Sequence, residues 1–254
     1  MKQRVISGAI IAAISIAVIL LGGGLFTLTC IFIAAQGCKE YISIRKGGFS
    51  FSLYIIMFLS VDALFFLHDY TITIMALEII ALMSIAVFDE EENYLDLCGI
   101  FLISQLMGNS LYFMVFVENY SKWLMGYLTI ISYITDVFAL FTGMKFGKHK
   151  LNERISPKKT TEGAIGGWIC GAIFSIIWAY IFKFFYFEPW IIILLSILLP
   201  IVSQVGDLIF SMIKRYYNVK DFSNLIPGHG GILDRFDSLL FNVLFFGAMI
   251  SIVI

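Results

Sequence analysis

Nine long apolar runs, separated by short polar segments, constrain what this chain can fold into. A helix needs about 20 apolar residues to cross the hydrocarbon core of a bilayer. Runs of that length take up most of the 254 residues and leave too little polar sequence for a separate water-soluble domain of ordinary size. We therefore predict an all-α fold, a polytopic membrane helical bundle with about nine transmembrane helices. The expected spans are 5–22, 25–44, 50–67, 71–88, 98–117, 123–142, 163–182, 189–213 and 236–254.

The positive charges are distributed unevenly over the loops between these spans. Cytoplasmic loops carry an excess of Lys and Arg near the ends of membrane spans. With nine spans and a cytoplasmic N-terminus, only Lys122 and Lys183 of the 17 basic residues fall on the outer side. We therefore expect the basic loop 143–162 and the mixed loop 214–235 to share the inner face of the cell membrane.

Composition excludes two other classes of protein. The chain has 17 Lys and Arg against 18 Asp and Glu, so it is not a generally basic nucleic-acid binder, and no nucleic-acid partner is expected. Its four cysteines form no C-x-x-C pair and lie in or beside apolar runs, which indicates neither a disulfide framework nor a zinc site. Because the positive and negative charges nearly balance, any anion-binding site must come from a local cluster of basic residues.

Acidic side chains gather at the inner ends of the last two spans. On a helix, Asp207, Ser211 and Lys214 share one face because they are spaced i, i+4 and i+7. Asp234 and Asp237 share a face in the same way. Carboxylates at the membrane boundary require a nearby cation. Mg²⁺ accepts one or two carboxylates together with substrate phosphates, so we predict a magnesium site at Asp207, Asp234 and Asp237.

Cations and a glycine-rich turn surround these acids. Basic side chains can hold phosphate oxygens that a metal leaves uncovered. In the turn 227–231, glycine allows backbone N–H groups to approach a phosphate closely. His229 in this turn either donates to a phosphate or caps the turn. The cations are Lys214, Arg215, Lys220 and Arg235.

A buried ion-pair network, or an ion path through the bundle, is the alternative for intramembrane acids. Asp62 and Glu78 stand alone on their spans, and for them this alternative stays open. A buried ion-pair network or an ion path explains the cluster 207–237 less well. Four cations, four carboxylates including Asp221 and a glycine-rich turn lie together there.

The segment from Ser211 to Asp237 reads S-x-x-K-R-x4-K-D-x-S-x2-I-P-G-H-G-G-I-x-D-R-F-D. It resembles the signature of phosphatidate cytidylyltransferases, also called CDP-diacylglycerol synthases. The pattern fixes many polar positions over a short stretch, so chance agreement is very improbable. Composition and spacing indicate only a metal and phosphate site, and the substrates come from the resemblance.

A second segment, from Asp136 through the loop 143–162, resembles the same family less closely. The family commonly shows Asp-Thr-x-Ala-Tyr and Gly-Arg here, whereas this chain has Asp136-Val-Phe-Ala-Leu and Gly143-Met. Lys145 is the obvious substitute for the missing Arg. The first five spans match the family only in hydrophobic character.

Glycines in and after this segment have a structural interpretation. Gly143 to Lys148 is not a phosphate-binding P-loop, because the spacing is one residue short and no Ser or Thr follows the Lys. The pairs Gly143-x-x-x-Gly147 and Gly167-x-x-x-Gly171 predict close helix packing.

The resemblance implies an activity and a division of the chain. The implied activity transfers the cytidylyl group of CTP to phosphatidic acid, giving CDP-diacylglycerol and pyrophosphate for phospholipid biosynthesis. Mg²⁺ would be the cofactor, a homodimer the assembly, and the active site would face the cytoplasm. Residues 1–254 would form one integral-membrane domain, with scaffold and lipid-groove helices in 1–122 and catalytic helices and cytoplasmic loops in 123–254.

Roles are assigned to individual residues on the same basis. The expected catalytic residues are Asp207, Lys214, Arg215, Lys220, Asp221, Asp234 and Asp237. The expected substrate-binding residues are Ser211, His229, Gly230, Gly231, Arg235, Asp136, Lys148, Ser156, Lys158, Lys159 and Thr160.

Two other functions remain open from the sequence. A related CTP-dependent enzyme could act on an ether lipid or a polyprenol, because the motif does not specify the lipid acceptor. An ion transporter could use the intramembrane acids. The gathering of polar groups at one face, rather than through the depth of the bundle, favours the enzyme.

Overall fold

The computed structural model describes residues 2–184, 187–226, 228 and 230–253, and within these the chain folds into nine α-helices. Five helical segments, His68–Phe88, Tyr94–Tyr120, Lys122–Phe146, Thr161–Ile181 and Pro189–Tyr216, are long and apolar enough to cross a membrane. The predicted mostly helical fold with several membrane spans is therefore confirmed, and the count of nine spans stays a prediction. The helices are α1 (Lys2–Leu21), α2 (Gly23–Ile42), α3 (Phe51–Phe66), α4 (Thr71–Phe88), α5 (Tyr94–Tyr120), α6 (Lys122–Phe146), α7 (Thr161–Ile181), α8 (Pro189–Tyr216) and α9 (Leu233–Val253).

Local sequence signals explain where several helices begin. The Ser121 side chain accepts the Leu124 N–H at 3.4 Å and caps α6, and Pro189 begins α8, where its missing N–H does no harm. A short 3₁₀ turn, η1 (His68–Tyr70), separates α3 from α4. At 16 residues, α3 is about 24 Å long, shorter than the roughly 30 Å hydrocarbon core.

The chain divides into two compact units. Unit 1 comprises Met1–Asn119 and Asp221–Arg235, and unit 2 comprises Tyr120–Lys220 and Phe236–Ile254. The first break falls close to the expected division at residue 122. The segment 221–235, however, groups with the N-terminal helices, although its sequence belongs to the signature motif. The residues of the signature motif are therefore divided between the two units.

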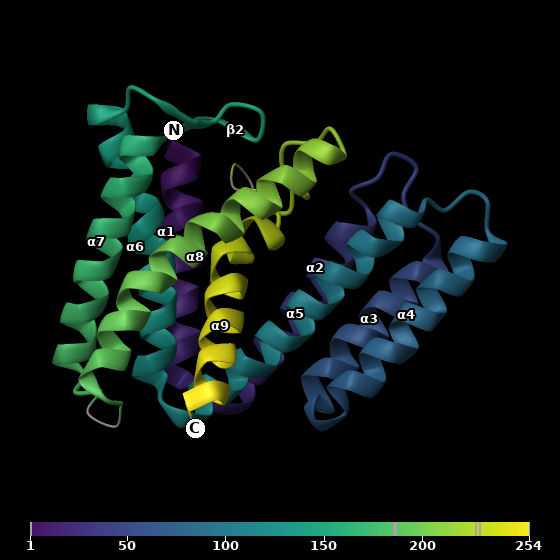
Figure 1. Cartoon of the computed structure of the whole chain (residues 1–254), viewed down its shortest axis with the longest axis horizontal. Coiled ribbons are helices and arrows are strands. Elements are labelled where there is room, and N and C mark those ends of the chain that lie inside the picture. Colours follow the sequence, from purple (N-terminus) through teal and green to yellow (C-terminus); the bar gives the residue numbers. More distant parts are fainter. Residues whose placement is uncertain (1, 185–186, 227, 229, 254) are drawn as a thin grey trace. The chain divides into compact units, whose positions relative to one another are not determined.

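Within unit 1, α2 lies against α3 and α3 lies against α4 (Figure 1), and α1 also contacts α2. Helix α5 contacts α3 closely at Gly108, where an added Cβ would lie 2.6 Å from the Leu64 Cβ. Glu78 on α4 is buried, and its carboxylate accepts hydrogen bonds from Ser104 and, at 2.6 Å, from Gln105, both on α5. Uncharged donors thus satisfy this intramembrane acid.

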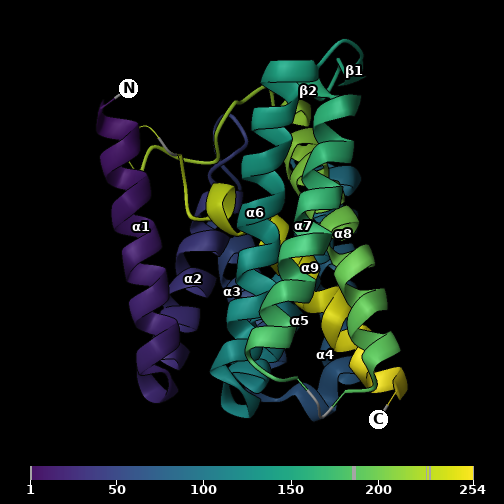
Figure 2. The same cartoon turned by 90° about the vertical axis from the view of Figure 1, so that its left-hand side faces the viewer.

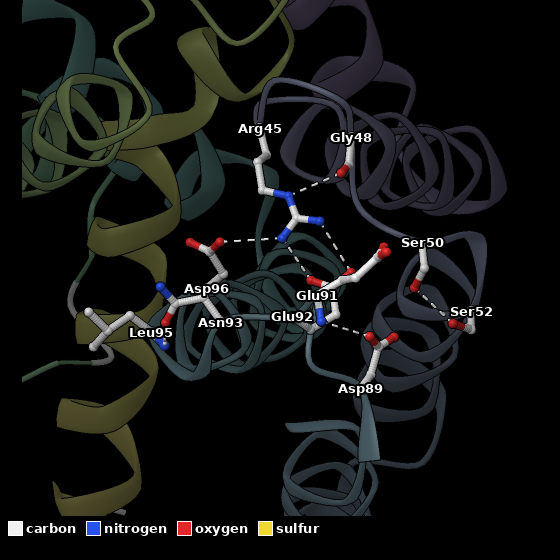
Figure 3. A network of polar contacts seen from close by, with 10 residues as sticks. All are labelled: Arg45, Gly48, Ser50, Ser52, Asp89, Glu91, Glu92, Asn93, Leu95 and Asp96. Carbon is white, nitrogen blue, oxygen red and sulfur yellow. Dashed lines mark hydrogen bonds and ion pairs between the residues drawn. The ribbon is translucent and has the colours of Figure 1, made fainter. Parts of the chain in front are cut away.

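An arginine joins two loops of unit 1 at one end of these helices (Figure 3). Arg45 donates to both carboxylate oxygens of Glu92, at 2.8 and 3.2 Å, and lies 3.5 Å from the Asp96 carboxylate. Its Nε also donates to the Gly48 carbonyl. Burial works against the charge, but the bonds to Glu92 and Asp96 outweigh it and raise the pKa of Arg45. This forked geometry holds the α2–α3 loop against the α4–α5 loop.

Within unit 2, α6, α7 and α8 lie side by side (Figure 2), and glycines allow α6 and α7 to approach closely. An added Cβ would lie 2.6 Å from the Ala139 carbonyl at Gly163 and 2.6 Å from the Thr135 carbonyl at Gly167. At Gly171 it would meet the Thr135 hydroxyl. The predicted packing role of Gly167 and Gly171 is confirmed.

A two-stranded hairpin joins α6 to α7, which the all-α prediction did not include. Its strands are β1 (Lys150–Asn152) and β2 (Ser156–Thr160), and they pair antiparallel. Glu162, in the first turn of α7, accepts the backbone N–H groups of Lys148 and His149 at 3.0 and 3.2 Å. The Glu162 carboxylate thus fixes the backbone just before the hairpin begins.

Candidate active site

Helices α8 and α9 place two of the predicted catalytic acids in unit 2. Gly206 on α8 lies directly against Phe241 on α9, since an added Cβ would lie 2.8 Å from the Phe241 Cδ2. Asp207 follows this contact in sequence, and Asp237 lies one helical turn before Phe241. Ser211 donates to the Asp207 Oδ1 at 3.3 Å, as the predicted i, i+4 spacing requires.

Asp237 is the centre of an electrostatic cluster in unit 2. Its carboxylate is only 9% exposed, and it interacts with Asp207, Asp136 and Lys214. These four side chains come from α6, α8 and α9. The Ser238 N–H donates to Asp237 Oδ1 at 2.8 Å. Asp207 and Asp136 both repel the charge on the Asp237 carboxylate, so this cluster favours a bound cation and the buried Lys214.

The hairpin contributes a second lysine to this cluster. Lys159 on β2 forms an ion pair with the Asp207 carboxylate. Side chains alternate along a strand, and the neighbouring Lys158 is exposed. The structure therefore separates two adjacent lysines that the sequence could not distinguish.

Other predicted catalytic and substrate-binding residues have structural partners in unit 2. Arg215 donates to the Ile155 carbonyl at 3.3 Å and to the Val219 carbonyl at 2.9 Å, which ties α8 to the hairpin. The Thr160 hydroxyl accepts the Gly163 N–H at 3.1 Å and caps α7. Ser156 is paired with Asn152 in the hairpin. These contacts shape the segment that carries Lys159.

The motif residues from Asp221 to Arg235 lie in unit 1, where Asp234 organises the loop before α9. Its Oδ2 accepts the backbone N–H groups of Phe222 at 2.8 Å and of Gly231 at 2.9 Å. The buried Asp234 carboxylate therefore holds both ends of the loop together. The Gly231 N–H, which we expected to approach a phosphate, is used by this bond.

Position 230 requires glycine for two reasons, its backbone conformation and the lack of room for a side chain. Its φ of +81° lies in the left-handed region, and an added Cβ would be 2.6 Å from the Asp234 Oδ2. Ile226 and Gly230 form an isolated β-bridge that closes the turn. The predicted His229 lies outside the described residues.

Lys148, Lys220, Asp221 and Arg235 complete the predicted set. Three of them are exposed: Lys148, Lys220 and Asp221. Arg235 is half-buried at the start of α9, and its backbone N–H donates to the Ile232 carbonyl at 2.9 Å. Lys220 and Asp221 are adjacent in sequence but belong to different units.

A magnesium ion fits this donor set only if substrate oxygens complete its coordination. Among the described side chains, no three His, Cys, Asp or Glu residues form a ready-made metal site. Asp207 and Asp237 nevertheless interact in unit 2, and Mg²⁺ commonly uses one or two carboxylates with phosphates and waters. Asp234, the third predicted ligand, lies in unit 1 and already accepts two N–H groups through one oxygen.

The family model described as "Cytidylyltransferase family" matches residues 2–253 of this chain. The chain belongs to this cytidylyltransferase family. It is 34% identical over 255 residues to the phosphatidate cytidylyltransferase of Staphylococcus haemolyticus, covering 95% of each chain. It is 29% identical over 260 residues to the Bacillus subtilis protein of the same name, covering 95% of this chain and 94% of that one. The Staphylococcus aureus (strain COL) protein, also so named, is 44% identical over 131 residues, about half of each chain.

Sequence reasoning overlooked one buried acid in this cytidylyltransferase. Glu40 on α2 accepts hydrogen bonds from Ser223 and from the backbone of Ile232 and Leu233. The available signal was an acidic residue inside the predicted membrane span 25–44. Nothing in the sequence indicated that its partners lie more than 180 residues away.

We predict that Gly230→Ala damages the site far more than Gly48→Ala. Both glycines have positive φ, +81° and +72°, so both substitutions cost about 1–2 kcal/mol in backbone strain. Only the methyl group at position 230 collides with Asp234, which adds about 1–3 kcal/mol. Thermal unfolding in detergent should show the larger fall in Tm for Gly230→Ala, with loss of cytidylyl transfer. Equal falls for both variants would contradict the loop geometry.

Proposed function

We propose that this cytidylyltransferase transfers the cytidylyl group of CTP to phosphatidic acid, producing CDP-diacylglycerol and pyrophosphate. The observation that carries the assignment is the similarity over nearly the whole chain to proteins named phosphatidate cytidylyltransferase. The interacting charges of Asp136, Asp207, Asp237 and Lys214 support it, because acids that repel one another favour a bound cation, and such a cation would neutralise the nucleotide and lipid phosphates.

The reaction requires no covalent enzyme intermediate. An oxygen of the phosphatidate phosphate attacks the α-phosphorus of CTP, and the bond from that phosphorus to the bridging oxygen of the β-phosphate breaks. The bridging oxygen and its electron pair leave with pyrophosphate. The protein therefore acts mainly by positioning the two phosphates and neutralising their charge.

The lysines of unit 2 are the proposed phosphate ligands closest to the acids. Lys159 and Lys214 interact with Asp207 and Asp237, respectively, so the acids hold these ammonium groups in place. Asp207 and Asp237 would also hold magnesium, which when bound supplies positive charge to the phosphate oxygens. Ser211 orients Asp207 through its hydroxyl.

In unit 1, Asp234 orders the loop that carries Asp221 and Arg235. We assign Arg235 and Lys220 to the phosphates, and Asp221 to orienting the adjacent cations. Arg215 would act mainly by fixing the hairpin that presents Lys159. The homodimer implied by the family resemblance is part of the same proposal.

We further propose that the chain crosses the membrane nine times with its N-terminus in the cytoplasm. The helix limits follow the nine apolar runs, and the hairpin between α6 and α7 and the segment after α8 carry most of the basic residues near the site. CTP is a cytosolic anion, so an inward-facing site gives it direct access. The acyl chains of phosphatidic acid can then remain in the lipid.

The activity is tested by incorporating labelled CTP into lipid with purified protein, omitting phosphatidate or Mg²⁺ in turn. We expect pyrophosphate release only with both substrates and the metal present. Asp207→Asn and Asp237→Asn should each lower kcat/KM by at least about 10²-fold, because removal of one charge from a phosphate-transfer site costs several kcal/mol. The exposed Asp69→Asn is the control. Full activity in Asp207→Asn would refute its proposed role, and transfer to another lipid phosphate or a polyprenol alone would refute the acceptor.

We predict that Lys159→Met and Lys158→Met differ in their effect on CTP. Loss of a charge-assisted bond from Lys159 removes about 1.5–3 kcal/mol, which corresponds to roughly 10- to 150-fold in kcat/KM for CTP. Lys158 is exposed and should lose no more than about threefold. Steady-state kinetics at varied CTP measure both, and the reverse order would show that the hairpin binds substrate through its other face.

The orientation is tested with single cysteines in a variant that lacks Cys30, Cys38, Cys98 and Cys170. Arg154→Cys marks the hairpin and Lys183→Cys marks the α7–α8 loop, and both positions are exposed. A membrane-impermeant maleimide added to intact cells should label Lys183→Cys. Arg154→Cys should react only after permeabilisation, and the opposite pattern would invert the proposed topology.

A further inference from the structure

Glu40 is a carboxylate held inside unit 1, outside the signature motif. It lies near the end of α2 and is only 2% exposed. A buried carboxylate is stable only when hydrogen-bond donors or cations surround it, because burial removes its hydration. The identity of its donors therefore shows which part of the fold requires it.

Of the four donors to Glu40 among the described residues, three come from the segment 221–235. The backbone N–H groups of Ile232 and Leu233 each donate at 2.9 Å, one to each carboxylate oxygen. The Ser223 hydroxyl donates at 2.8 Å. Gln36, one turn earlier on α2, donates at 3.2 Å. Both oxygens thus accept bonds from a distant segment, and one of them also accepts the bond from Gln36 within α2.

Two glycines permit this close approach. An added Cβ at Gly231 would collide with the Glu40 Oε2, and one at Gly37 would lie 3.2 Å from the Leu233 Cδ2. Helix α2 therefore presents Gln36, Gly37 and Glu40 on one face to the start of α9. The Ile232 and Leu233 N–H groups, which a phosphate at the start of α9 would need, already donate to Glu40.

The contacts continue from Glu40 to the motif acids. Leu233 is followed directly by Asp234, whose carboxylate accepts the N–H groups of Gly231 and Phe222. Phe222 in turn follows Asp221. A change at Glu40 therefore displaces the backbone on both sides of Asp234 and, through the loop, Asp221.

We infer that Glu40 is a positioning residue that fixes the loop 221–235 for cytidylyl transfer. The inference rests on the proposed function for its consequence in catalysis, but the loop geometry is independent of the substrate. Glu40 acts through the backbone of Ile232 and Leu233 and through Ser223, and it forms no part of the phosphate-binding set.

The test compares Glu40→Gln and Glu40→Asp with a matched control, Glu118→Gln. Gln keeps the shape of Glu40 but replaces one carboxylate oxygen with an NH₂ group, which cannot accept a hydrogen bond from a backbone N–H. Asp keeps the charge but withdraws it by about 1.5 Å. Glu118 is also buried, at 4% exposed, in unit 1, and it accepts the Gly23 N–H at 3.4 Å, with no bond to the loop among the described contacts.

Two measurements decide the role. At saturating CTP and phosphatidate, Glu40→Gln should lower kcat by about 10- to 100-fold with KM for CTP within about threefold, because misplacement by about 1 Å costs up to about 10²-fold. Glu40→Asp should recover part of that loss. Hydrogen exchange of the peptide 221–235 should quicken at least tenfold in Glu40→Gln, while peptides from α6 stay unchanged. Glu118→Gln should alter neither the loop exchange nor kcat.

Wild-type kcat in Glu40→Gln would overturn the inference. So would exchange that quickens evenly over the whole chain together with a lower Tm, because that result shows a merely structural role. If the wild-type protein makes no CDP-diacylglycerol, the proposed function has failed. The exchange measurement then decides alone: a loop that exchanges as in the wild type overturns the positioning role, and local quickening supports it.

Discussion

Carboxylates inside an apolar helical bundle are stable only where donors or cations neutralise them, and the folded chain depends on how it meets this requirement. Glu78 uses a hydroxyl and an amide. Glu40 and Asp234 use backbone N–H groups of the loop before α9. Asp237 interacts with two other acids as well as a lysine, and it belongs to the proposed phosphate site. The acids named here as bound by neutral donors therefore have a structural explanation, whereas a cation would relieve the repulsion around Asp237.

Small residues allow the backbones to come close enough for these contacts. Gly206 brings α8 against α9 beside Asp207, and Gly163 and Gly167 bring α6 against α7. Membrane helices gain little from burying apolar side chains against one another, because lipid is equally apolar, so close backbone approach and polar contacts carry much of the association. Helices that meet at glycines therefore set the positions of Asp136, Asp207 and Asp237.

The loop before α9 and the hairpin between α6 and α7 present the polar groups of the proposed site. Each is fixed by a carboxylate that accepts backbone N–H groups: Asp234 and Glu40 for the loop, and Glu162 for the hairpin. Such bonds hold irregular backbone at the end of a bundle, where no neighbouring strand or helix satisfies it. These bonds also fix the backbone from which the flexible side chains of Lys159 and Arg235 extend.

The sequence by itself determined the helical class, the limits of most helices and the family, because apolar length and local turn chemistry are encoded residue by residue. It also identified Asp207, Ser211 and Lys214 as one face of a helix, since that spacing is a property of the helix alone. Only the tertiary structure decided that Lys159 rather than Lys158 contacts Asp207, that Thr160 and Arg215 hold the hairpin, and that Glu40 fixes a loop more than 180 residues away. These assignments depend on which helix ends meet in space, and no local pattern in the chain records the partner of a buried charge.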